Sequence, residues 1–192
     1  MVDYELLDRF ESQLVDEMLR IVTSRMLLDG SLLSSEDIDY RWHELAPEYM
    51  VDATKEIAQY PTVAVAWAAY LGMAVANGWD KDWANTQKAT YQSFYGADGF
   101  DDMDEHIVQN ILGLSLDSVD AKQIMNILLC CAQKAATFIQ HEHIEHQTVK
   151  AFHIFARTVK VMFRIGAALQ LKRLGYKFHK VALDRNGSKL LS

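Results

Sequence analysis

Apolar residues recur every three or four positions along almost the whole chain, and this spacing constrains the fold more than any other feature. Leu7, Phe10, Leu14 and Met18 follow it near the start of the sequence, and residues at this spacing share one face of a helix. No segment shows the sustained apolar and polar alternation of a half-buried strand. The sequence therefore predicts an all-α fold.

The chain has 192 residues, of which 50% are hydrophobic. A chain of this size and composition buries a sufficient core as one domain, without disulfides or a structural metal. We expect a compact single-domain bundle of about six to seven helices over residues 1–180. The last residues, 181–192, are expected to form a loosely ordered C-terminal tail.

Residues 61–77 predict the central helix of this bundle. Pro61 is the first residue of the segment and Gly78 follows it, which is the usual placing of the two residues at helix ends. The segment is Ala-rich and apolar on nearly every face, so other helices should surround it. Its longest apolar run, 63–76, is too short to span a bilayer, and we expect no membrane partner. Small residues at helical spacing should let neighbouring helices approach closely: Ala64, Ala68, Gly72 and Ala76.

Other helix boundaries follow from caps and helix breakers. The first helix should begin after Asp3 and end near Leu28, and Ser34 opens the second. Pro47 is expected to break or kink that second helix and to start a new one. The aromatic segment that follows the central helix predicts an amphipathic helix capped by Asp80.

The span from Ser118 to Gly175 contains no proline and only one internal glycine, Gly166. One helix of that length would measure about 85 Å, too long for a domain of this size. The apolar stripe of its first half ends at Ile139, and a second stripe begins with Val149, Phe152, Phe155 and Val159. The helix should therefore break between the stripes, and a long C-terminal helix should cover about 148–174 with Thr148 as its cap.

The predicted break contains the segment "QHEHIEHQTVKAFH", which holds four of the seven histidines. Two ligands of a metal on one helix are usually three or four residues apart. The cluster at His141–His146 meets that spacing, but it matches neither the zincin motif nor its inverted form. The sequence also contains no Glu-x-x-His pair of the kind that di-iron bundles use, and no His-Asp dipeptide. The simplest interpretation is a polar junction between two helices, and no cofactor is predicted.

A metal-dependent hydrolase is nevertheless an alternative function for the cluster. It requires a divalent metal held by residues from two predicted helices: His143, His146, Asp102 and His106.

Charge is distributed unevenly along the chain. Residues 1–147 hold 9 Lys and Arg and 25 Asp and Glu, which gives a net charge of −16. Residues 148–192 hold 10 Lys and Arg and 1 acidic residue, which gives a net charge of +9. The two parts add up to the −7 of the whole chain. On the C-terminal helix, residues spaced by three and four positions form one cationic face. We call this face the basic ridge: His146, Lys150, His153, Arg157, Lys160 and Arg164.

The basic ridge has three possible roles. It pairs with an acidic surface of the same chain, for which the segment 98–105 is the candidate, or it meets an acidic surface on another copy or another protein. Phosphate or nucleic-acid binding is the third, disfavoured by the acidic net charge and by the lack of aromatic residues on the ridge. Our leading functional interpretation is a non-catalytic protein-interaction or self-association module, and so a homo-oligomer.

Nucleophilic catalysis has no sequence signature in this chain. No serine lies in a Gly-x-Ser-x-Gly motif, so no catalytic residue is predicted and the chain is expected not to be an enzyme. The adjacent Cys130 and Cys131 lie in an apolar helical pattern, as do reduced core cysteines of cytoplasmic proteins. The acidic first residues are unlike a secretory signal, and a cytoplasmic location is therefore expected.

Overall fold

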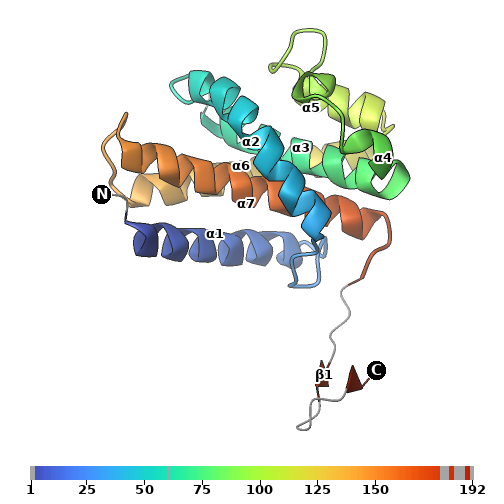
Figure 1. Cartoon of the computed structure of the whole chain (residues 1–192), viewed down its shortest axis with the longest axis horizontal. Helices are drawn as coiled ribbons and strands as arrows, with labels where there is room; N and C mark the ends of the chain where they lie inside the picture. The colour runs from blue at the N-terminus through green and yellow to red at the C-terminus, as the bar shows by residue number, and fades with distance from the viewer. Residues whose placement is uncertain (1–2, 60, 178–181, 184–188, 191–192) are drawn as a thin grey trace.

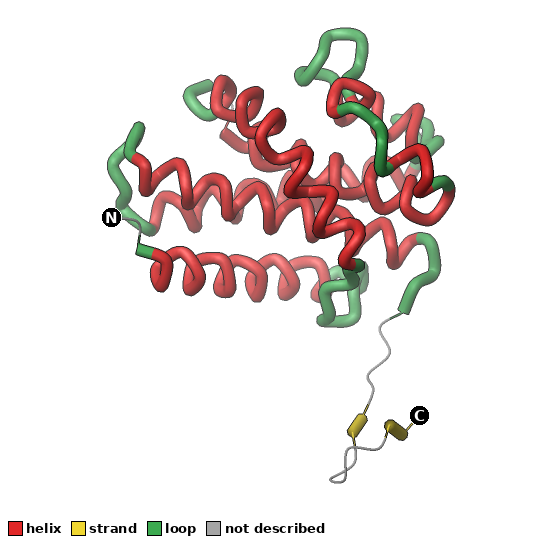
Figure 2. The backbone as a smooth tube through the Cα atoms, viewed as in Figure 1, coloured by secondary structure: helices red, strands yellow, loops and turns green. Residues whose placement is uncertain are grey.

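The computed structural model describes residues 3–59, 61–177, 182–183 and 189–190. Most of the described chain is helical, as Figure 2 shows, and the predicted all-α bundle is confirmed. The helices are α1 (Tyr4–Ser24), α2 (Glu36–Glu56), α3 (Pro61–Lys81), α4 (Trp83–Thr86), η1 (Tyr91–Phe94), α5 (Met103–His106), η2 (Ile107–Ile111), α6 (Val119–His141) and α7 (Val149–Arg173).

Helices α3 and α7 form the centre of the bundle and make the most extensive contact with each other. Helix α1 lies along one side of α7, α2 crosses α7 on the near side in Figure 1, and α6 contacts α3, α1 and α7. Helix α3 is buried continuously from Ala64 to Ala66 and from Ala68 to Asn77. The sequence prediction of a central Ala-rich helix is therefore correct, and the helix continues past Gly78 to Lys81.

Two glycines allow α3 and α7 to touch along their backbones. A Cβ atom on Gly72 of α3 would lie 1.9 Å from the carbonyl oxygen of Phe163, and one on Gly166 of α7 would lie 1.8 Å from that of Ala69. Both distances are far below van der Waals contact, and the opposing atoms are backbone. The close approach expected of Gly72 is therefore present, and Gly166 provides the matching gap on α7.

Side-chain caps set the beginnings of the long helices. Asp3, Ser118 and Thr148 each accept a hydrogen bond from the backbone N–H three residues ahead, which satisfies one of the unpaired donors of the first turn. The cap of α2 is Ser35 rather than the predicted Ser34. Helix α1 ends at Ser24, four residues before the predicted end.

Helix α2 passes through Pro47 without a break, so the predicted break there and the new helix from Pro47 are wrong. Proline removes one backbone donor, and the carbonyl group of His43 loses its partner. Both His43 and Pro47 are exposed, so water can satisfy that carbonyl. The buried side chains of Trp42 and Tyr49 fix the helix on either side of the proline, and the indole of Trp42 packs 4.9 Å from the ring of Phe163.

The predicted amphipathic helix after the central helix is also wrong. Asp82, not Asp80, caps the short helix α4, and its carboxylate accepts hydrogen bonds from both the backbone and the side chain of Asn85. Such local bonds compete with helix continuation. The chain then turns, and η1 places Tyr91 and Phe94 in the core.

Within the described residues, no helix combines the length and the apolar composition needed to cross a membrane. The predicted loose tail, 181–192, lies mostly outside the described residues. The described part of it consists of two short strands that pair antiparallel, β1 (Ala182–Leu183) and β2 (Lys189–Leu190).

Candidate functional site

The basic ridge lies along α7, and its two halves have different surroundings. We call Arg157, Lys160 and Arg164 the inner half, and His146, Lys150 and His153 the outer end. The inner half lies where α7 packs between α1 and α2, whereas the outer end begins in the loop between α6 and α7 (Figure 1).

Every member of the inner half forms an ion pair with a carboxylate of the same chain. Arg157 hydrogen-bonds to Glu11 of α1 and lies 3.1 Å from Asp8, and the Nζ atom of Lys160 lies 2.7 Å from a Glu11 oxygen. The Nε atom of Arg164 lies 3.5 Å from Asp39 of α2, without the geometry of a hydrogen bond. These contacts neutralise the inner half and attach α7 to both neighbouring helices.

Glu11 is the central carboxylate of this network, because it bonds to two cations at once. Its side chain is only 13% exposed. Burial raises the pKa of Glu11, but the hydrogen bonds from Lys160 and Arg157 outweigh that effect and leave the pKa below its usual value. The same contact raises the pKa of Arg157. Glu11 is therefore ionised at neutral pH, and the contact is an ion pair.

The inner half lines two small hollows on either side of α7. One, of about 270 Å³, lies against α2 and contains Trp42 and His43, and the other, of about 360 Å³, lies against α1. Arg164 borders both hollows. Carboxylates line both hollows beside the cations, so neither presents a uniformly positive surface to an anionic ligand.

The outer end of the ridge has different contacts. His146 and Lys150 are exposed and His153 is half-buried. Within the part of the chain that the structure describes, none of the three side chains forms a hydrogen bond or an ion pair with another residue. His146 and Lys150 therefore present their polar groups to solvent, whereas the half-buried ring of His153 packs against Phe152, with 5.9 Å between the ring centroids.

Two apolar side chains lie beside the outer end. Val149 is 67% exposed and Phe152 is 48% exposed, although the sequence pattern predicted them as the start of the buried stripe of α7. The first buried residue of α7 is Ile154, because no described element covers the first turn. The apolar stripe therefore begins at Phe155 rather than at Val149, and its first two members join the exposed surface.

The loop that precedes this turn is the predicted polar junction. His143 and Gln147 adopt left-handed backbone conformations, with φ of 48° and 64°. The hydroxyl of Thr148 donates to the carbonyl of Glu145 and accepts from the backbone N–H of Ala151. The break between α6 and α7 and its Thr148 cap are therefore as predicted.

The structure does not bring the four proposed metal ligands together. His143 and His146 follow the end of α6, whereas Asp102 and His106 precede its start, and α6 has 23 residues, a length of about 35 Å. Within the described residues, no group of three or more His, Cys, Asp or Glu side chains is arranged to hold a metal ion. Asp102 instead accepts a hydrogen bond from the backbone of Asp98.

The acidic partners of the inner half differ from those the sequence suggested. They are Asp8, Glu11 and Asp39, whereas none of the ion pairs found in the described chain involves the acidic segment 98–105. Asp8 and Glu11 are three residues apart on one face of α1, which is the only sequence sign of their role. Which helix would pack beside α7 was not evident from the sequence.

Comparisons with protein-family models, with curated proteins and with solved structures find no match to this chain.

Proposed function

We propose that the protein is a non-catalytic interaction module that binds an acidic protein surface through the outer end of its basic ridge. The observation that carries this proposal is the combination at the start of α7. His146, Lys150 and His153 have no polar partner within the described residues, and Val149 and Phe152 are exposed beside them.

The chemistry of this surface defines its partner. Exposed apolar side chains provide the burial energy of an interface, and charges around them provide specificity and attraction at a distance. A partner should therefore present an apolar residue surrounded by carboxylates. The inner half supports this function indirectly, because its ion pairs fix α7 against α1 and α2 and so hold the outer end in place.

Phosphate or nucleic-acid binding has less support. Such binding uses several Lys and Arg side chains along one surface, and the three inner cations already face carboxylates. Only Lys150 of the ridge carries a permanent positive charge without an ion-pair partner within the described residues. The metal-dependent alternative has no support in the arrangement of the described residues.

A cytoplasmic location is part of the same proposal. Cys130 and Cys131 are free thiols, and the second is fully buried. Burial raises the pKa of Cys131 to about 12, so it is protonated and unreactive, as is common for core cysteines of reducing compartments.

The proposal is tested with a fluorescent peptide in which glutamates flank a leucine. Binding by the whole protein, followed by anisotropy, should weaken with salt. Lys150→Glu and Phe152→Ala should each weaken it about tenfold or more. Lys88→Glu is the matched control, since Lys88 is also exposed and has no ion pair among the described residues; it should bind as the wild type does.

Equal binding by the wild type and Lys150→Glu would rule out the outer end as the binding surface. A labelled single-stranded oligonucleotide of the same charge serves as the second probe. Tighter binding of the oligonucleotide than of the peptide would favour the nucleic-acid alternative.

A further inference from the structure

A third hollow, of about 460 Å³, lies between the start of α6 and the segment that follows α1. This volume is within the usual range of small-molecule sites. Two cations, Arg25 and Lys122, line the hollow together with apolar and amide side chains. No carboxylate of the described residues lines it, in contrast to the two hollows beside the basic ridge.

The end of α1 provides one side of the hollow. Met26 has a left-handed backbone conformation with φ of 58°, and the backbone N–H of Leu27 donates to the carbonyl of Val22 over 3.0 Å. This arrangement closes a helix in a tight turn. The turn carries Arg25 and Leu27, so the position of both is set by local backbone hydrogen bonds.

The first two turns of α6 provide the other side. Val119 and Ile127 are eight residues apart and share one face of the helix. Val119 is 82% exposed, whereas Ile127 is buried at the base. Lys122, Gln123 and Asn126 are exposed polar side chains of the same stretch. The hollow therefore combines apolar surface with groups that donate hydrogen bonds.

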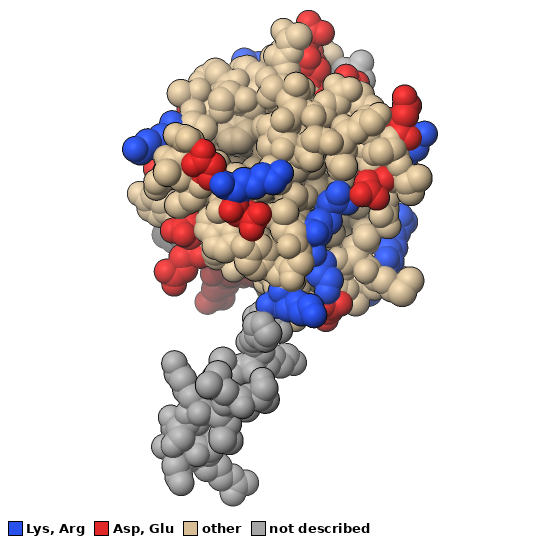
Figure 3. Space-filling view, turned by 90° about the vertical axis from the view of Figure 1, so that its right-hand side faces the viewer, with Lys and Arg blue, Asp and Glu red and all other residues tan. Residues whose placement is uncertain are grey.

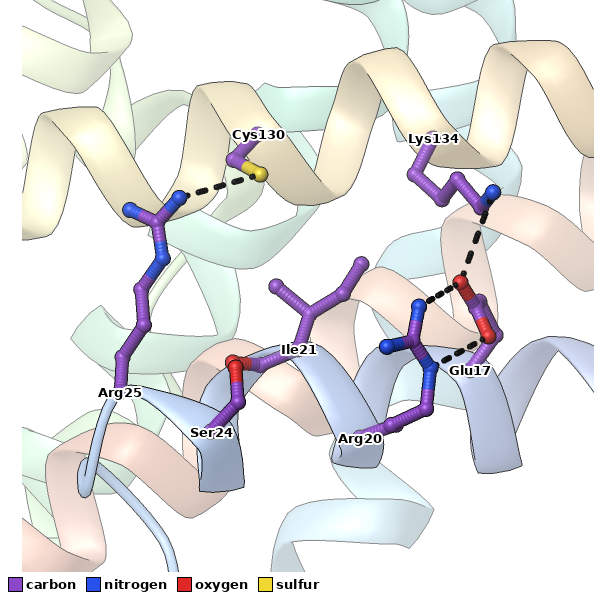
Figure 4. A network of polar contacts seen from close by, with 7 residues as sticks. All are labelled: Glu17, Arg20, Ile21, Ser24, Arg25, Cys130 and Lys134. Atoms are coloured by element: carbon purple, nitrogen blue, oxygen red, sulfur yellow. Dashed lines mark hydrogen bonds and ion pairs between the residues drawn. The ribbon is translucent and has the colours of Figure 1, made fainter.

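Arg25 has no carboxylate partner within the described residues. Its side chain extends from the end of α1 to α6, where a guanidinium nitrogen lies 3.5 Å from the sulfur of Cys130 (Figure 4). A thiol sulfur is only a weak acceptor. The carboxylate of Glu17 in the same view is held by Arg20 at 2.6 Å and by Lys134 at 3.5 Å. The remaining donors of Arg25 are therefore available to a ligand.

The acidic residues next to these segments in the sequence do not neutralise the hollow. Asp29 pairs with Lys172, and Asp120 lies 3.5 Å from Arg173, so both carboxylates face the end of α7. Asp117 precedes α6 and does not line the hollow. The positive charge of the hollow is thus without an ion-pair partner in the part of the chain that the structure describes.

We infer that this hollow binds a small molecule with an anionic head group and an apolar chain. The planar guanidinium of Arg25 matches two oxygens of a carboxylate or a phosphate, and Lys122 adds a second charge. The apolar chain of the ligand then lies against Leu27, Val119 and Ile127. No residue of the outer end of the basic ridge takes part, so this inference is independent of the proposed function.

Isothermal titration calorimetry of the whole protein with octanoate and with octyl phosphate tests the inference. At least one of them should bind, more weakly at high salt, and the tighter of the two identifies the head group. Octylammonium has the same chain and the opposite charge, and it should not bind. Arg25→Gln should weaken binding of the anion about tenfold or more, because the bidentate charged contact is lost.

Arg20→Gln is the matched control, since Arg20 is an exposed arginine of α1 that already pairs with Glu17. It should bind the anion as the wild type does, and so should Lys150→Glu at the outer end of the ridge. Val119→Asp should weaken binding without changing the circular dichroism spectrum. Failure of both anions to bind, equal binding of octylammonium, or equal binding by the wild type and Arg25→Gln would overturn the inference.

Discussion

Glu11 shows how one residue determines the role of several others. It turns two cations of α7, Arg157 and Lys160, into attachment points for α1. Without it, two positive charges would lie one turn apart on α7 and repel each other. Three carboxylates on other helices, Asp8, Glu11 and Asp39, thus pair with the inner half of the basic ridge and leave its outer end unpaired within the described residues.

We predict that Glu11→Gln lowers the free energy of unfolding by about 1–3 kcal/mol at pH 7, because it leaves two partly buried cations with weaker partners. The pKa of Glu11 is lower in the folded state than in the unfolded state. Its stabilisation is therefore present above the unfolded pKa and is lost as the pH falls through the folded pKa.

Urea denaturation at pH 7 and in strong acid measures this difference. The two proteins should differ at neutral pH and converge in acid. Glu5→Gln is the control, since Glu5 is exposed and has no ion pair within the described residues. A constant difference at both pH values would contradict the ion-pair explanation.

The contribution of Asp104 to stability should depend on pH in the opposite direction to that of Glu11. Burial raises the pKa of Asp104 from 3.8 to about 6, so the ionised carboxylate destabilises the fold. The stabilisation that the protonated carboxyl gives the folded state is fully present below the unfolded pKa. It is lost as the pH rises through the folded pKa of about 6. Asp104→Asn should therefore raise the free energy of unfolding by about 1 kcal/mol at pH 8, a value reduced by partial solvent screening.

The gain from Asp104→Asn should disappear near pH 3.5, where the wild-type carboxyl is protonated. Thermal denaturation at the two pH values measures it, with the exposed Asp101→Asn as the control. A destabilised Asp104→Asn at pH 8 would show that the carboxylate makes a favourable contact.

At the residue scale, the sequence predicted where a side chain lies on its helix better than which residue it pairs with. The spacing of the ridge and the Thr148 cap depend on local geometry, which the sequence contains. The ion pairs of Arg157 and Arg164 depend on which helices pack beside α7, and the exposure of Val149 and Phe152 depends on where the other helices end. These are properties of the assembled bundle.

Among the helices, the contact between α3 and α7 is the least tolerant of change. Gly72→Ala should destabilise the protein by about 3 kcal/mol or more, because the new methyl group would overlap the backbone of Phe163. Gly78→Ala is the control. Its methyl group would meet the side chain of Thr86 on the short helix α4 rather than the backbone of a central helix, and the cost should be smaller. If urea denaturation gave Gly72→Ala and Gly78→Ala the same loss in the free energy of unfolding, this explanation of the contact between α3 and α7 would be contradicted.

Replacement of Pro47 should stabilise the protein, in contrast to replacement of Gly72. Pro47 lies inside α2 on the exposed face, and its replacement by alanine restores one helical hydrogen bond without disturbing the core. We expect Pro47→Ala to raise the free energy of unfolding by about 1–3 kcal/mol. A lower thermal midpoint for Pro47→Ala would indicate that the proline is required for the shape of α2.

Helices with strong apolar periodicity were predicted well, and segments with competing local signals were not. The stripe of α1 from Leu7 to Ile21 is buried as expected. The cost of Pro47 to α2 depends on whether the carbonyl that loses its partner is exposed to water, and the sequence does not contain this information. The segment after α3 differs from its prediction because its buried aromatic residues, Tyr91 and Phe94, enter the core from a short 3₁₀ helix that follows a turn.

At the scale of the whole molecule, most of the positive charge of α7 is used within the chain. Besides the inner half, Lys172 pairs with Asp29 and Arg173 with Asp120 near the other end of the helix. Figure 3 shows that end of the molecule, where Lys and Arg side chains lie beside Asp and Glu. The outer end of the ridge is different, and this difference is the basis of the proposed function.

The division of the ridge is tested most directly by urea denaturation of two variants with the same change of charge, Arg157→Glu and Lys150→Glu. We predict that Arg157→Glu lowers the free energy of unfolding by about 2 kcal/mol or more, since it breaks the pairs with Glu11 and Asp8 and adds repulsion. Lys150→Glu should change it by less than about 0.5 kcal/mol. Equal destabilisation by both variants would contradict a structural inner half and an outer end available for binding.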